Sequence, residues 1–169
     1  MISKDELLAY LQKIDAEIKE PVTLIAVGGT AMTLLGIKDT TKDVDFCIEA
    51  KKDYNTIKKL IEKSGSRIRV DLFREGYIFS VQLPEDYSRL ARPVKGSFRN
   101  VKLKTLHPID LIISKTDRLN ERDIEDIEVL IKRVKKAKLQ QRYKQVIDSI
   151  PGRRENFEYN IRQVLKLWQ

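Results

Sequence analysis

Residues 27–30 read Val-Gly-Gly-Thr and residues 43–45 read Asp-Val-Asp, and these two motifs decide the fold that the sequence predicts. The first motif ends the apolar run 22–27, which has the length and the β-branching of a buried strand. A glycine pair between this strand and a short predicted helix at 31–35 lets the backbone approach a phosphate, and the amides at a helix start favour an anion. The alternative for the glycine pair is a tight turn with a helix cap.

The two aspartates of the second motif lie on one face of a predicted strand. Residues 43–49 alternate polar and apolar side chains, so Asp43 and Asp45 are about 7 Å apart along the strand. Two carboxylates on one face repel each other unless a cation lies between them, and Mg²⁺ binds through carboxylate oxygens. The pair therefore predicts a magnesium clamp, and a solvated strand edge is the alternative.

A third aspartate interrupts the apolar alternation of residues 67–73. Aspartate is disfavoured in strands, yet Asp71 occupies the face opposite the apolar side chains. If this strand neighbours the strand of Asp45, three carboxylates converge, which is the number that a two-metal site needs. The alternative is an exposed aspartate at a sheet edge.

The order of the remaining patterns predicts an α/β protein of the α+β kind. A mixed β-sheet core is expected over residues 1–106, and a helical extension packed on it is expected over residues 107–169. Besides the segments above, strands are predicted at 77–83 and 100–106. Helices are predicted from a capping box at Ser3 to about Glu20, and at 53–63, 107–117, 120–137, 139–150 and 153–168.

Composition restricts the class of protein further. Cys47 is the single cysteine of the 169-residue chain, which excludes an intramolecular disulfide, and no apolar run approaches about 18 residues. The polar, acidic start is unlike a signal peptide, so we expect a cytoplasmic protein without a membrane partner. The formal net charge of +8 favours a nucleotide or a nucleic acid as partner, although a heavily solvated surface has the same composition.

The motifs together resemble the nucleotidyltransferase superfamily of the DNA polymerase β type. In that superfamily, a glycine-glycine or glycine-serine turn precedes an aspartate-x-aspartate and a later strand aspartate, as residues 27–30, 41–46 and 69–73 do here. The closest branch consists of minimal bacterial and archaeal nucleotidyltransferases related to toxins of abortive-infection systems. Its lysine-then-Arg-Asp-x-x-Asp pattern is similar to the series Lys115, Arg118, Arg122, Asp123 and Asp126. The resemblance covers residues from about 22 to 131.

This resemblance implies transfer of a nucleoside monophosphate from an NTP to an acceptor hydroxyl, with release of pyrophosphate. Carried over to this sequence, Asp43 and Asp45 bind both Mg²⁺ ions, and Asp71 completes the site as a ligand and a candidate base.

The nucleotide contacts carried over from the family are the glycine turn and one lysine. Gly28, Gly29 and Thr30 would hold the triphosphate, and Lys115 is a candidate triphosphate contact from the helical part. Many members have a serine where this chain has Gly29, so the phosphate half of the site departs from the family pattern more than the metal half.

The acceptor is left open between an RNA, including tRNA, and a protein. Seven basic residues without an acid between them form either a stripe for RNA phosphates or a solvated helical face: Lys132, Arg133, Lys135, Lys136, Lys138, Arg142 and Lys144. A second hypothesis is a catalytically inactive binding module of the same fold for a nucleotide, an RNA or a protein. A third is a toxin that an antitoxin partner neutralises.

Overall fold

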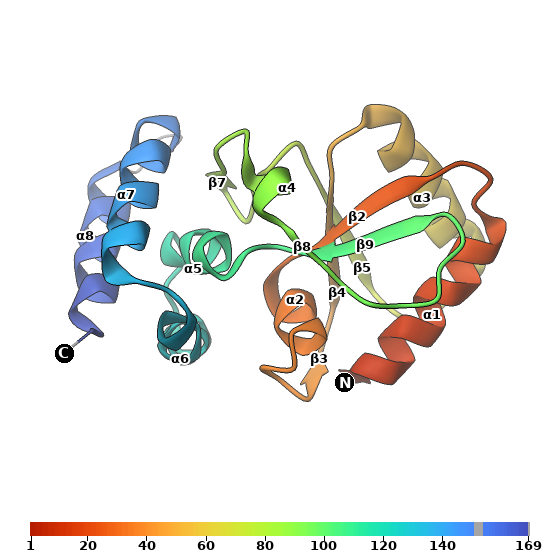
Figure 1. Cartoon of the computed structure of the whole chain (residues 1–169), viewed down its shortest axis with the longest axis horizontal. Helices are drawn as coiled ribbons and strands as arrows, with labels where there is room; N and C mark the ends of the chain where they lie inside the picture. The colour runs from red at the N-terminus through yellow and green to blue at the C-terminus, as the bar shows by residue number, and fades with distance from the viewer. Residues whose placement is uncertain (151–153, 169) are drawn as a thin grey trace. The chain divides into compact units, whose positions relative to one another are not determined.

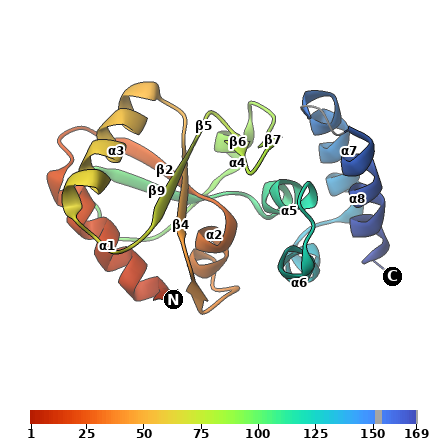
Figure 2. The same ribbon diagram turned by 180° about the vertical axis from the view of Figure 1, so that it is seen from behind.

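The computed structural model describes residues 1–150 and 154–168, and its contacts divide the chain into two compact units. The first unit comprises Met1–Glu75 and Leu90–Leu106, and the second comprises Gly76–Arg89 and the chain from His107 onward. Figures 1 and 2 show a sheet with helices in the first unit and mostly helices in the second. The second unit is thus made of two separate stretches of the chain, and the domains predicted at 1–106 and 107–169 stay a prediction.

A mixed sheet forms the first unit, as the sequence predicts. Its strand order is β5-β4-β2-β9-β8. β2 pairs antiparallel with β4 and parallel with β9, β4 pairs parallel with β5, and β8 pairs antiparallel with β9. The strands are β2 (Val22–Ala26), β4 (Val44–Ile48), β5 (Val70–Arg74), β8 (Arg92–Pro93) and β9 (Val101–Thr105), and β1 (Ile2–Ser3) pairs separately with β3 (Thr40–Thr41).

Three helices accompany this sheet: α1 (Lys4–Glu17), α2 (Gly28–Leu34) and α3 (Lys51–Ser64). The predicted capping box begins α1, because Ser3 and Glu6 each accept the other's backbone N–H. α1 ends before Glu20 because Ile18 is extended. The Asp15 carboxylate accepts the backbone N–H groups of residues 99–101 at 2.7–2.8 Å, which ties the end of α1 to the start of β9.

β4 is buried along its whole length, because it lies between β5 and β2. The predicted core positions Val44, Phe46 and Ile48 are confirmed. The opposite face is covered as well, since Cys47 is inaccessible and Asp45 is only 8% exposed. A solvated strand edge, the alternative for the aspartate pair, is therefore wrong for Asp45.

Two sequence predictions near β5 are corrected. β5 begins at Val70 rather than at Arg67. Residues 77–83 do not form one strand, because β6 (Tyr77–Ile78) and β7 (Val81–Gln82) pair with each other as a hairpin. The chain reverses between them at Phe79 and Ser80, both of which have positive φ.

In the second unit, α5 is the central helix and packs against α6, α7 and α8. The predicted helix 120–137 is too long, because α6 ends at Leu130, a single 3₁₀ turn follows and Val134 is extended. The predicted start of the last helix at Arg153 lies outside the described residues. The elements are α4 (Tyr87–Leu90), α5 (Pro108–Thr116), α6 (Glu121–Leu130), η1 (Ile131–Arg133), α7 (Lys136–Val146), η2 (Ile147–Ser149) and α8 (Arg154–Lys166). None of the helices in the described ranges has the length and apolar character needed to cross a membrane.

Candidate active site

Asp45 and Asp71 are directly paired residues on the neighbouring parallel strands β4 and β5. Side chains of paired residues point to the same face of a sheet, so both carboxylates leave the sheet on one side. β4 and β5 are therefore neighbours. This is the condition on which the sequence argument for a third carboxylate depended. Asp43 lies just before β4 and is partly exposed.

The glycine turn lies beside the start of β4. The Val27 N–H donates to the Asp45 carbonyl at 3.1 Å, which continues the β2–β4 pairing up to the turn. Gly28 then begins α2 with a φ of +53°, a conformation that favours glycine. The backbone of residues 27–29 is thereby held next to the two aspartates of the second motif.

Thr30 fixes this arrangement through its hydroxyl group. The hydroxyl donates to the Asp43 carbonyl at 3.1 Å and accepts the Asp45 N–H at 2.8 Å. Thr30 is inaccessible to solvent. Its hydroxyl is therefore hydrogen-bonded to the backbone of the aspartate motif. The contact with the triphosphate that was predicted for Thr30 stays a prediction.

Thr41 accounts for the glycine at position 29. A Cβ on Gly29 would lie 2.7 Å from Thr41 Oγ1, so a serine there requires Thr41 to move. The Thr41 hydroxyl also donates to the Asp43 carbonyl, at 2.9 Å. Sequence reasoning missed Thr41, and a single sequence carries no signal for it beyond its place two residues before Asp43.

Asp71 forms an ion pair with Arg69, two residues earlier in the chain. Arg69 Nη2 lies 3.0 Å from Asp71 Oδ2, and the side chains are 70% and 40% exposed, respectively. Exposed ion pairs contribute only about 0–1 kcal/mol to stability. A rotation of Asp71 from Arg69 towards Asp45 consequently costs little free energy.

The donor atoms and the register of these residues fit Mg²⁺, which prefers carboxylate oxygens. As they stand, however, no three His, Cys, Asp or Glu side chains within the described ranges gather closely enough to hold a metal ion. That Asp43, Asp45 and Asp71 hold the ion together stays a prediction.

Lys115 lies inside the second unit and is 4% exposed. Its ammonium group is 2.7 Å from Asp126 and 3.3 Å from Asp123. Arg118 binds Asp123 with two hydrogen bonds of 2.7 and 2.8 Å. Burial opposes ionisation of Asp123, but Arg118 and Lys115 outweigh it and lower the pKa of this carboxyl group. These contacts give Lys115 a structural role, and its contact with a triphosphate stays a prediction.

The comparison with protein families agrees with this geometry. The chain belongs to a family described as nucleotidyltransferase of unknown function (DUF6036), which matches residues 5–167. Comparisons with curated proteins and with solved structures found no match. The family match confirms the resemblance to nucleotidyltransferases and extends it over both units, while the relation to toxins stays a prediction.

Proposed function

We propose that this protein is a Mg²⁺-dependent nucleotidyltransferase that moves a nucleoside monophosphate from an NTP to a hydroxyl of an RNA or a protein. The observation that carries the proposal is the pairing of Asp45 with Asp71 on neighbouring parallel strands, beside the glycine turn. Membership of a nucleotidyltransferase family supports the reaction class.

In the proposed reaction, the acceptor hydroxyl oxygen attacks the α-phosphorus, and the bond to the oxygen that bridges the α- and β-phosphates breaks. Pyrophosphate leaves, and Asp71 is the candidate base for the hydroxyl proton. Bound Mg²⁺ would neutralise the charge on the phosphate oxygens and lower the pKa of the attacking hydroxyl. Asp43 and Asp45 would hold the Mg²⁺ that orients the phosphates, while the glycine turn allows phosphate to approach the backbone. Catalysis would then consist of positioning and charge stabilisation.

An RNA acceptor is supported by the exposed basic residues around α7. Arg142 is not one of them, because it is buried and forms ion pairs with Asp110 and Asp86. The other six basic residues of the series are exposed and have no acid between them: Lys132, Arg133, Lys135, Lys136, Lys138 and Lys144. Such residues can neutralise RNA phosphates.

The test is transfer of label from an α-labelled NTP to a panel of RNA and protein acceptors. We expect Asp43→Ala combined with Asp45→Ala to abolish transfer, because both proposed metal ligands are gone. The control is Glu49→Ala, an exposed acid directly after β4, which should transfer label like the wild type. Circular dichroism checks that both variants are folded. Full transfer by the double variant would exclude the proposed site.

The second candidate function is a catalytically inactive module that binds a nucleotide, an RNA or a protein partner. It is favoured by the phosphate side of the site, because Gly29 lacks a hydroxyl and the hydroxyls of Thr30 and Thr41 are engaged by the backbone. Binding of NTP and Mg²⁺ without release of pyrophosphate against the whole acceptor panel would establish this function.

A further inference from the structure

The chain contains no acid between Asp86 and Asp110, although 25 of its 169 residues are aspartate or glutamate. β8 and β9 lie in this stretch and form a hairpin at one edge of the sheet (Figure 1). They belong to the first unit, together with the aspartate motif. We call residues 92–104 the basic hairpin. Its basic residues are Arg92, Lys95, Arg99, Lys102 and Lys104.

The side chains of the basic hairpin are accessible to a partner. Four of the five cations are exposed and Lys104 is half-buried. Within the part of the chain that the structure describes, neither Lys95 nor Lys102 forms an ion pair. The hairpin therefore presents positive charge that the protein itself does not neutralise.

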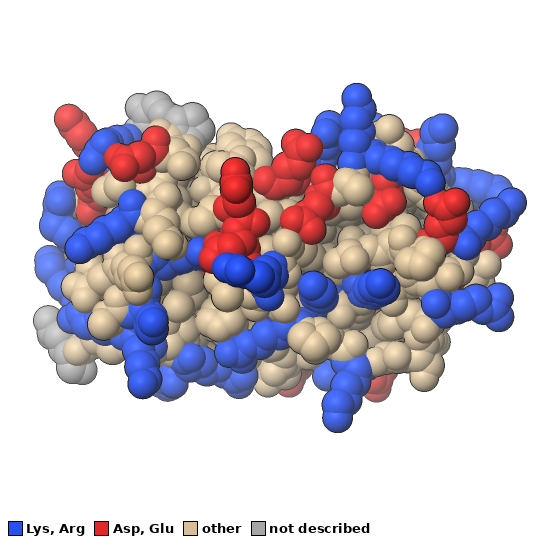
Figure 3. Space-filling model, turned by 45° about the horizontal axis from the view of Figure 1, so that its top comes forward, with Lys and Arg blue, Asp and Glu red and all other residues tan. Residues whose placement is uncertain are grey.

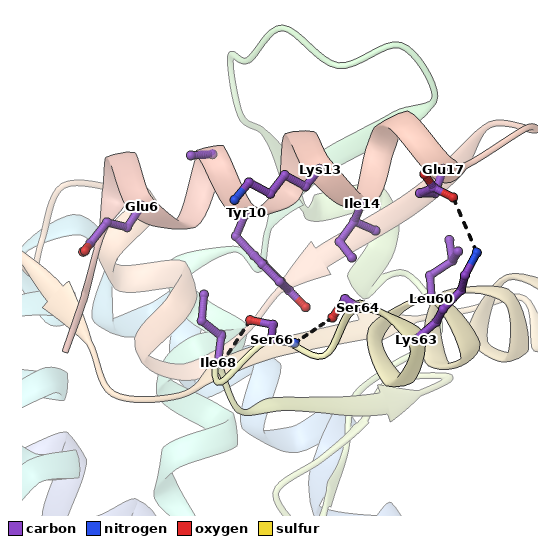
Figure 4. A pocket seen from close by; sticks show the side chains of 11 residues that line it. Glu6, Tyr10, Lys13, Ile14, Glu17, Leu60, Lys63, Ser64, Ser66 and Ile68 are labelled. Atoms are coloured by element: carbon purple, nitrogen blue, oxygen red, sulfur yellow. Dashed lines mark hydrogen bonds and ion pairs between the residues drawn. The ribbon is translucent and has the colours of Figure 1, made fainter.

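Lysines on the helices of the first unit have acidic neighbours instead. Lys63 of α3 lies 4.0 Å from Glu17 of α1, as Figure 4 shows, and Lys52 forms an ion pair with Glu20. α1 and α3 each carry charges of both signs. The acid-free hairpin is thus a distinct feature and does not follow from the high content of charged residues alone.

The backbone of the basic hairpin is held in place. The Asp15 carboxylate accepts the N–H groups of residues 99–101, and the Val94 N–H donates to the Leu103 carbonyl at 2.9 Å. Asp15 is 7% exposed and interacts electrostatically with Arg99, so it balances part of the charge of that arginine. A preformed surface loses little conformational entropy when it binds a partner.

The register places two lysines of the hairpin on the face of the sheet that carries the aspartates. Lys104 pairs with Ile25, which pairs with Cys47. Cys47 lies two residues after Asp45 on β4, so the side chains of Lys104, Lys102 and Asp45 leave the sheet on one side. Only β2 separates β9 from β4, which puts these two strands about 10 Å apart.

The spacing of the cations and a neighbouring aromatic ring favour a nucleic acid. A strand of RNA carries one negative charge per nucleotide, and a row of lysines without acids can neutralise successive phosphates. Phe98, in the loop between β8 and β9, is half-buried, and a Cβ on Gly96 would lie 2.4 Å from its ring. The glycine thus leaves room for a partly exposed ring on which a base can stack. An acidic protein would use the charge but not the ring.

We propose that the basic hairpin binds the phosphate backbone of single-stranded RNA and directs the strand across the sheet towards Asp45 and Asp71. That this RNA is the acceptor rests on the proposed nucleotidyl transfer. The contact between hairpin and RNA does not, because it requires neither Mg²⁺ nor an NTP.

The test is the affinity of the full chain for a fluorescent single-stranded RNA of about 20 nucleotides, longer than the 4–16 that one single-strand-binding domain usually covers. Anisotropy is measured over a range of salt concentrations without Mg²⁺ or NTP. Lys95→Gln combined with Lys102→Gln should reduce the salt slope by about 1.4, because each phosphate contact contributes about 0.7. The affinity at about 0.1 M salt should then fall about 20-fold.

The matched control is Lys13→Gln combined with Lys59→Gln, which removes two exposed lysines from α1 and α3. It lowers the net charge equally and should keep RNA affinity within about twofold of the wild type, because distant charges are screened. All four substituted lysines are exposed, so both variants should keep the wild-type melting temperature. Equal losses of affinity in the two variants would overturn the proposal, as would polyglutamate binding as tightly as RNA.

A further pair of variants separates the RNA contact from the reaction. Asp43→Ala combined with Asp45→Ala should bind RNA at least as tightly as the wild type, because it removes negative charge. Loss of all transfer with this binding intact would end the proposed reaction and leave the hairpin as an RNA site. Lys136→Gln combined with Lys138→Gln tests α7. Affinity that falls only in the α7 variant would place the RNA on the second unit and overturn the inference.

Discussion

The Thr30 hydroxyl joins the glycine turn to the start of β4 by two hydrogen bonds, and the side chain is fully buried. Together with Thr41, it holds the Asp43 carbonyl from two sides. The two threonines therefore determine where the backbone places both aspartates. We regard them as positioning residues for the proposed metal ligands.

Thr30→Val preserves the shape of the side chain but removes the hydroxyl. The Asp45 N–H then loses its acceptor, so we expect a loss of about 1–3 kcal/mol in the free energy of unfolding and a higher Mg²⁺ requirement for transfer. Thr30→Ser keeps the hydroxyl and should restore both properties. Urea unfolding and Mg²⁺ titration measure them. An unchanged stability with only a higher KM for NTP would instead assign Thr30 to the triphosphate.

Arg69→Gln tests whether Arg69 competes with Mg²⁺ for Asp71. Because the exposed ion pair with Asp71 contributes about 1 kcal/mol at most, its removal should lower the half-saturating Mg²⁺ concentration by up to about fivefold. The control is Arg67→Gln, an exposed arginine two residues earlier. Transfer rates across a Mg²⁺ titration provide the readout, and a raised Mg²⁺ requirement would count against the competition.

At the residue level, alternation in the sequence predicts that Asp45 and Asp71 each lie opposite the apolar side chains of their own strands, and the pairing of β4 with β5 places them on one shared face. Alternation does not predict Thr41, because the contact with Gly29 depends on how the loop before β4 folds back on the turn. It also cannot choose between phosphate and Asp71 as the partner of Arg69. The structure pairs Arg69 with Asp71.

Among the elements, α5 and α6 are joined by buried ion pairs rather than by apolar contacts alone. Lys115 of α5 faces Asp123 and Asp126 of α6, and all three side chains are at most 5% exposed. Buried carboxylates that lose their cation are strongly destabilising. We therefore expect the lysine to stabilise the second unit.

Lys115→Met should lower the free energy of unfolding by about 3–5 kcal/mol, because it leaves two buried carboxylates without this cation. Lys138→Met, at an exposed position of α7, is the control and should change stability by less than about 0.5 kcal/mol. Thermal and urea unfolding compare the two variants. A stable Lys115→Met protein with a higher KM for NTP would support the triphosphate contact instead.

Hydrophobic periodicity and helix-capping patterns predict most of the helices and strands. They predict the ends of these elements less well. The capping box at Ser3 and the proline that begins α5 place two helix starts correctly. The break between α6 and α7 has no glycine or proline, so periodicity runs through it. The hairpin at residues 77–83 is missed because its turn uses Phe79 and Ser80, which are not usual residues for positive φ.

For the whole molecule, the family match covers both units, so the helical unit belongs to the family pattern and is not an unrelated addition. Figure 3 shows Lys and Arg side chains spread over much of one face, with acidic side chains among them. The net charge of +8 therefore does not by itself identify a binding site. The toxin hypothesis predicts that expression of the protein arrests growth. Asp45→Ala should relieve this arrest.

The most direct measurement is a crystal structure with Mg²⁺ and an NTP whose α- and β-phosphates are joined by a methylene group. We predict carboxylate oxygens of Asp43, Asp45 and Asp71 at about 2.1 Å from Mg²⁺, the glycine turn beside the phosphates, and Arg69 separated from Asp71. Metal ions bound only to phosphate oxygens, with Asp71 still paired with Arg69, would contradict the account.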